Sequence, residues 1–110
     1  MRRGLLLAVL AGAAPAAAQT LPPELLAAYS VGRAAYLLTQ ASPCFPREGG
    51  DAALWRMLEQ AQARIHGRAE QEQAFELGRR HASQQQRHIP RSDPVACREI
   101  RAALLHALRD

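Results

Sequence analysis

Residues 22–40, PPELLAAYSVGRAAYLLTQ, repeat apolar side chains at the interval of an α-helix. Leu25, Tyr29 and Tyr36 are separated by four and seven positions, which places them on one helical face. The two prolines fit the first turn of a helix, and Thr20 is placed to cap it. We therefore expect a first amphipathic helix over about residues 22–40.

Three further segments have helical spacing. The second spans about residues 52–66, with Asp51 as its cap, and the third spans about residues 68–88. The fourth begins at Pro94, with Asp93 as its cap. Val, Ile and Thr are scarce and no segment alternates apolar with polar residues, so strands are disfavoured. The pattern predicts an all-α fold, a small antiparallel bundle of about four helices.

The glycines and prolines punctuate this pattern. Residues 41–50 contain two prolines and two glycines, which indicates a loop between the first two helices. Gly67 is expected to end the second helix or to mark a short break. Gly32 lies inside the first helix, where it costs about 1 kcal/mol relative to alanine. It indicates the close approach of another helix, or a cost that the fold tolerates.

The N-terminus has the pattern of a secretory signal peptide. Residues 1–3 contain two arginines, residues 5–14 are mostly apolar, and residues 16–18 are three alanines that suit a cleavage site. The apolar run is too short to span a bilayer. We expect residues 1–18 to be cleaved, leaving residues 19–110 as a single domain with no transmembrane segment, in the periplasm or secreted.

The two cysteines, Cys44 and Cys97, both belong to the mature chain. Disulfides persist in such a compartment, and two cysteines permit one intramolecular bridge. An up-down bundle places the loop after the first helix and the start of the fourth helix at the same pole, so the bridge would join them there. On the chain-entropy model it contributes roughly 4 kcal/mol. No C-x-x-C spacing or nearby histidine supports the alternative of a redox or metal site.

The charge balance excludes one class of partner. The formal net charge of +4 includes the two arginines of the leader, so the mature chain is only mildly basic. That is too little to indicate nucleic-acid binding. The chain has no lysine and is rich in alanine, which is typical of a GC-rich bacterial genome.

A basic cluster in the third segment is the candidate site for an anion or an acidic partner. Arginines can bind phosphates or carboxylates with two hydrogen bonds, and the histidines would add charge below about pH 6.5. The alternative is a solvated helix face that runs into an exposed connector. The cluster consists of Arg79, Arg80, His81, Arg87, His88 and Arg91.

We expect no catalytic activity, cofactor or metal. No two histidines are three or four residues apart, and no serine lies in a nucleophile elbow. Glu72 and Glu76 are the nearest approach to a carboxylate pair, and we expect arginines such as Arg68 and Arg79 to form surface salt bridges with them. His81 and His88 are seven residues apart, which is compatible with a shared ligand.

An ordered set of single positions along the chain forms a recognisable pattern. The positions are Gly32, Tyr36, Leu37, Cys44, Trp55, Arg56, Phe75, Gly78 and Cys97. The pattern resembles a family of short exported alphaproteobacterial proteins with a leader, a helical body and two cysteines. The sequence departs from that pattern before the second cysteine, where residues 89–93 form an extra connector. The family has no assigned activity, so the resemblance implies a fold, a compartment and a disulfide only.

These observations predict a non-catalytic interaction or adaptor protein, a monomer or weak dimer, whose partner is another envelope protein or an acidic surface. The first alternative is a holdase-like stress protein, because acid would charge the histidines and loosen the bundle. The small periplasmic acid-stress chaperones are likewise helical, exported and joined by one disulfide, but a shared architecture does not carry function. The second alternative is a binder of a small ligand or metal through His81 and His88.

Overall fold

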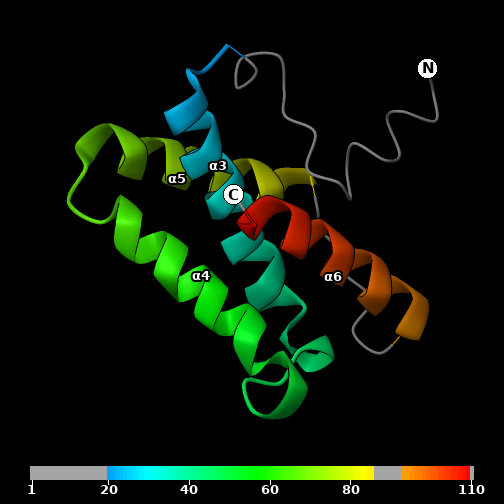
Figure 1. Ribbon diagram of the computed structural model, residues 1–110. Helices are drawn as coiled ribbons and strands as arrows, with labels where there is room; N and C mark the ends of the chain where they lie inside the picture. Colours follow the sequence, from blue (N-terminus) through cyan, green and yellow to red (C-terminus); the bar gives the residue numbers. More distant parts are fainter. Residues whose placement is uncertain (1–19, 86–92, 110) are drawn as a thin grey trace.

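The computed structural model describes residues 20–85 and 93–109, and every regular element in these ranges is helical. The predicted signal peptide, residues 1–18, lies outside them. Two short 3₁₀ turns lie in the loop between the first two long helices: η1 (Ser42–Cys44) and η2 (Gly49–Asp51). The predicted all-α bundle is confirmed, and it consists of α3 (Pro23–Gln40), α4 (Ala52–Ile65), α5 (Ala69–Gln85) and α6 (Pro94–Leu108) (Figure 1).

The helix starts confirm two of the expected signals and correct a third. Pro23 opens α3, but its N-cap residue is Pro22, so the expectation that Thr20 caps this helix is wrong. The proline ring presets the backbone for the helix, which makes a side-chain cap less necessary. At α6, the Asp93 carboxylate accepts a hydrogen bond from the backbone N–H of Val95 at 3.0 Å, as predicted.

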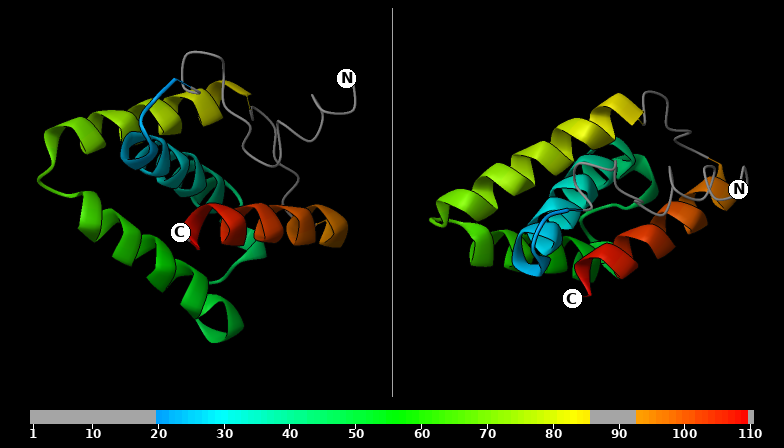
Figure 2. Two further views of the ribbon diagram at one scale, coloured as in Figure 1. Left: turned by 45° about the horizontal axis from the view of Figure 1, so that its top comes forward. Right: turned by 90° about the horizontal axis from the view of Figure 1, so that it is seen from above.

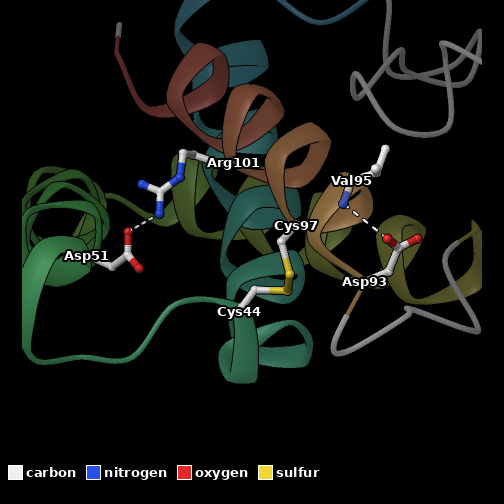
Figure 3. Close-up of a disulfide and its surroundings, with 6 residues drawn as sticks. All are labelled: Cys44, Asp51, Asp93, Val95, Cys97 and Arg101. Atoms are coloured by element: carbon white, nitrogen blue, oxygen red, sulfur yellow. Dashed lines mark hydrogen bonds and ion pairs between the residues drawn. A yellow bond between two sulfur atoms is a disulfide. The ribbon is translucent and has the colours of Figure 1, made fainter.

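Asp51 precedes α4 but does not cap it with its side chain, which corrects the second expected cap. Its carboxylate instead accepts a hydrogen bond from Arg101 of α6 (Figure 3). At the other end of α4 the chain turns at Gly67, which has a φ of 84°. This left-handed conformation is accessible to glycine at little cost, and it ends the helix as predicted.

The core surrounds α3 and is completed by side chains from the loop after it and from α4, α5 and α6. Tyr29, Leu38, Phe45 and Leu104 are its largest fully buried residues. Burying a side chain of this size contributes about 1.5–3 kcal/mol. Trp55 of α4 is also buried, and its indole N–H donates to the Phe45 carbonyl oxygen at 2.8 Å, so the loop after α3 is fastened to α4.

Helices α3 and α5 cross with their backbones in contact. A Cβ atom at Gly32 would collide with the Phe75 carbonyl oxygen, and one at Gly78 would collide with the Tyr29 carbonyl oxygen. The side chains that α5 buries are correspondingly small: apart from Gly78, they are alanines. Gly32 therefore marks the close approach of another helix, and that helix is α5.

The disulfide between Cys44 and Cys97 is present, with the two Cα atoms 5.6 Å apart. It joins the loop after α3 to the first turn of α6, and the Asp51–Arg101 pair lies one turn further along α6 (Figure 3). The staple at one pole of the bundle is therefore confirmed. None of the helices formed by residues 20–85 and 93–109 is both long and apolar enough to cross a membrane.

Candidate functional site

The crossing of α3 and α5 brings four polar side chains together. The glycines at the crossing let the two backbones approach, so side chains on neighbouring turns can meet across it. We call this group the α3–α5 cluster: Tyr29 and Arg33 of α3 with His81 and Gln85 of α5. The two helices lie side by side in both views of Figure 2.

Tyr29 and His81 form one half of the cluster. The Tyr29 hydroxyl lies 2.8 Å from His81 Nδ1, and the two rings meet edge to face with centroids 5.5 Å apart. With His81 neutral and its proton on Nε2, the hydroxyl donates to Nδ1. Burial lowers the pKa of His81, and the nearby cations Arg33 and Arg80 lower it further. Burial raises the pKa of the Tyr29 hydroxyl, against the opposing effect of Arg33. This half of the cluster therefore favours the neutral forms of both rings.

Arg33 and Gln85 form the other half. Arg33 is only 2% exposed, and its Nη1 donates to the Gln85 amide oxygen at 2.6 Å. Its guanidinium carbon lies 6.0 Å from the centre of the Tyr29 ring. Among the described residues, Nε and Nη2 of Arg33 have no hydrogen-bond partner. A buried cation with unpaired donors is unusual, because such groups are normally paired when they leave water.

A cleft with a cavity volume of about 810 Å³ lies next to this cluster, and Arg33 is among the residues that line it. It is bounded by α3, by the C-terminal halves of α4 and α6, and by the turn between α4 and α5. The volume lies within the range of ligand pockets, about 300–1,000 Å³. The floor of the cleft is apolar and buried; it includes Ala28, Val31, Ala34, Ile65, Leu104 and Leu108.

The rim of the cleft is mostly basic. Arg64, His66, Arg68 and His106 line it and are exposed, and Glu24 is the one acidic residue among the residues that line the cleft. His66 is within 3.7 Å of a Glu72 carboxylate oxygen, so part of its charge is compensated when it is protonated. The cleft thus combines an apolar floor with a rim that attracts negative charge.

The predicted basic cluster does not form one surface within the described residues. Arg79 pairs with Glu76 one turn earlier on α5, as the sequence predicted for this pair, and Arg80 is exposed. The bond to Arg79 lowers the pKa of Glu76. His81 turns toward α3 instead, where it meets Tyr29.

The remaining members of that cluster, Arg87, His88 and Arg91, lie outside the described residues. The proposed shared ligand of His81 and His88 therefore stays a prediction. In the described ranges, no three side chains of His, Cys, Asp or Glu lie close enough together to hold a metal ion. Cys44 and Cys97 are bonded to each other.

Sequence reasoning missed both Arg33 and the cleft. A signal for Arg33 was present, because it is the one charged residue between Glu24 and Arg47. A single arginine in a long, otherwise almost uncharged helix lies either at the surface or in the interior. Helical spacing does not distinguish these two positions. The sequence contains no comparable signal for the cleft, because the residues that line it come mostly from three separate helices.

No protein-family model matches the chain, and none of the curated proteins or solved structures compared with it is similar.

Proposed function

We propose that this protein is a non-catalytic binding protein that works outside the cytoplasm and receives an apolar, acidic segment of a partner protein in its cleft. The observation that carries the proposal is the cleft itself, with its buried apolar floor and basic rim. An apolar face laid into such a groove is a recurring mode of peptide recognition. Export to the periplasm or beyond is supported by the predicted leader and by the Cys44–Cys97 disulfide.

The charge of the rim argues for the acidic character of the partner. Arg64 and Arg68 each bring a basic side chain to the rim, while Glu24 is the one acidic residue that lines the cleft. Opposite charge across an interface speeds association and excludes partners of like charge. A segment with apolar side chains for the floor and Asp or Glu residues for the rim satisfies both features of the cleft.

The proposal is tested by site-specific photocrosslinking in the producing cell. Benzoylphenylalanine replaces Ala63, an exposed alanine of the cleft, or Ala102, an exposed alanine of α6 that does not line it. We expect one partner to be crosslinked from position 63 and not from position 102. Ala27→Phe, which narrows the mouth of the cleft, should abolish the crosslink.

The chemistry of the captured segment is the decisive readout. Mass spectrometry of the crosslinked peptide should identify an apolar segment with acidic residues. Arg64→Glu combined with Arg68→Glu should weaken binding of that synthetic peptide about tenfold at low salt. Arg56→Glu, at an exposed position of α4 outside the cleft, is the matched control. Equal crosslinking from positions 63 and 102, or a basic peptide, would refute the proposal.

A second candidate, the holdase-like stress protein, is favoured by one contact of the α3–α5 cluster. Protonation of His81 would place a second cation beside the buried Arg33, and Arg80 adds a third charge nearby. The Tyr29 hydroxyl would also lose its acceptor. This function predicts that dye binding to apolar surface increases as the pH falls from 7 to 5, together with protection of aggregating client proteins. An adaptor should show little change over that range.

A further inference from the structure

The unpaired donors of Arg33 have a specific geometry. Nε and Nη2 lie on the same edge of the guanidinium plane, while Nη1, on the other side, is the nitrogen that donates to Gln85. Through that edge an arginine can donate two parallel hydrogen bonds to the two oxygens of a carboxylate. One complete bidentate edge of a buried arginine therefore has no hydrogen-bond partner in the part of the chain that the structure describes.

The surroundings of Arg33 do not neutralise its charge. Within the described residues, no Asp or Glu forms an ion pair with Arg33. The neighbouring groups are the Tyr29 ring, His81 and, along α5, Arg80, so the local potential is positive. Leaving the donors of a charged group buried and unpaired costs about 1–3 kcal/mol or more. An anion on the free edge would remove this cost.

We propose that the free edge of Arg33 is a binding site for a carboxylate. Both nitrogens of that edge are themselves buried, so a carboxylate that enters from the cleft displaces the side-chain atoms that now cover them. Arg33 belongs both to the residues that line the cleft and to the α3–α5 cluster, so it joins the two. Gln85 accepts from Nη1, and the edge formed by Nε and Nη2 has no hydrogen-bond partner among the described residues. The apolar floor of the cleft receives whatever apolar body the carboxylate carries.

The site stands apart from the proposed function. A free carboxylate ion would bind the guanidinium whether or not a partner protein uses the cleft. If the proposed function holds as well, an Asp or Glu side chain of the partner segment supplies the same group. The experiment uses free carboxylates alone, so its outcome does not depend on whether a partner protein binds in the cleft.

The test follows thermal unfolding of the mature protein in sodium acetate, sodium decanoate or sodium chloride at equal ionic strength and pH 7.5. We expect a saturable rise of the Tm with both carboxylates and a smaller, unsaturable effect of chloride. At ten times the dissociation constant the rise should be about 5–10 °C. Ala27→Phe should weaken the response to decanoate and leave the response to acetate unchanged, because only the decanoate chain occupies the cleft.

Three variants test whether the effect depends on Arg33. Arg33→Met keeps the length of the side chain and should abolish the acetate response, without lowering the Tm in acetate-free buffer. Arg56→Met, at an exposed arginine of α4, should keep the full response. Gln85→Glu places a carboxylate on the guanidinium from within the chain, so it should raise the Tm in acetate-free buffer and reduce the gain from acetate.

An NMR titration measures two quantities that acetate would not change if Arg33 had a purely structural role. Acetate bound at Arg33 should shift the Arg33 Nε–H resonance and raise the pKa of His81, because it offsets the positive charge beside the imidazole. Neither change should occur in Arg33→Met. The proposal is overturned if acetate and chloride act alike, or if Arg33→Met retains the acetate response. If Arg33→Met does not fold, an unchanged Arg33 resonance in acetate overturns it in the wild-type protein.

Discussion

The Tyr29 hydroxyl and His81 Nδ1 lie 2.8 Å apart and join helices α3 and α5 beside their crossing. The contact depends on a neutral imidazole, because a protonated one has no acceptor at Nδ1. Burial and the charges of Arg33 and Arg80 lower the pKa of His81 in the folded protein. The unfolded chain titrates near the ordinary value of about 6.5.

We predict that the protein loses stability as the pH falls below about 6.5. Between 6.5 and the lower pKa of the folded state, the unfolded chain binds more protons, so the free energy of unfolding decreases as the pH falls. Above 6.5 the contribution of His81 is fully present. Urea unfolding at pH 7.5, 6.5 and 5.5 measures this dependence.

His81→Gln is the variant that tests the cause. It removes the titrating group, so the loss between pH 7.5 and pH 5.5 should be smaller than in the wild type. His106→Gln changes an exposed histidine of α6 and should leave the loss unchanged. The explanation fails if both variants retain the wild-type pH dependence.

A second prediction concerns the crossing of α3 and α5. Gly32→Ala should destabilise the protein by about 1–3 kcal/mol, because the new Cβ collides with the Phe75 carbonyl oxygen. This loss would override the gain of about 1 kcal/mol that alanine usually brings inside a helix. Chemical denaturation measures it. Gly50→Ala is the control, since no atom lies within 4 Å of a Cβ there, and a similar loss in both variants would contradict the account.

The disulfide should be the largest single contribution among these features. Replacing Cys44 and Cys97 together by serine should lower the free energy of unfolding by about 2–5 kcal/mol, because the bridge spans 53 positions of the chain. Thermal unfolding with and without a reductant checks the same quantity in the wild type. A change in Tm of less than about 2 °C in both measurements would contradict it.

Asp51 provides a test that separates an ion pair from a helix cap. Asp51 and Arg101 form a hydrogen-bonded pair, with the Asp51 side chain 14% exposed. A double-mutant cycle with Asp51→Ala and Arg101→Met should give a coupling energy of about 0.5–1 kcal/mol. If Asp51 were a cap of α4, its replacement would cost the same with or without Arg101, and the coupling would be zero.

The local features of the fold could be predicted from the sequence. The starts of α4 and α6, the cap at Asp93 and the turn at Gly67 all follow from residues within a few positions of each other. The disulfide followed from the cysteine count and the expected compartment. Such signals need no knowledge of how the helices pack.

What could not be predicted depends on contacts between distant residues. Asp51 is a residue type that often caps helices and it precedes α4, but its carboxylate pairs with Arg101 instead. Gly32 indicated the close approach of another helix, but the sequence does not say that this helix is α5 or that Arg33 is buried beside the crossing. His81 was assigned to a basic surface, and the same crossing turns it toward Tyr29.

The position of the disulfide also has a mechanical consequence. It fixes the N-terminal end of α6 to the loop after α3, whereas the cleft is lined by the C-terminal half of α6. The part of α6 between Cys97 and its last residue, Leu108, extends over about 16 Å, so a rotation of α6 about its bridged end moves its other end the most. A rotation of about 5° there would displace that end by about 1.4 Å. Such a rotation would change the width of the cleft while the bridged end of the bundle stays in place.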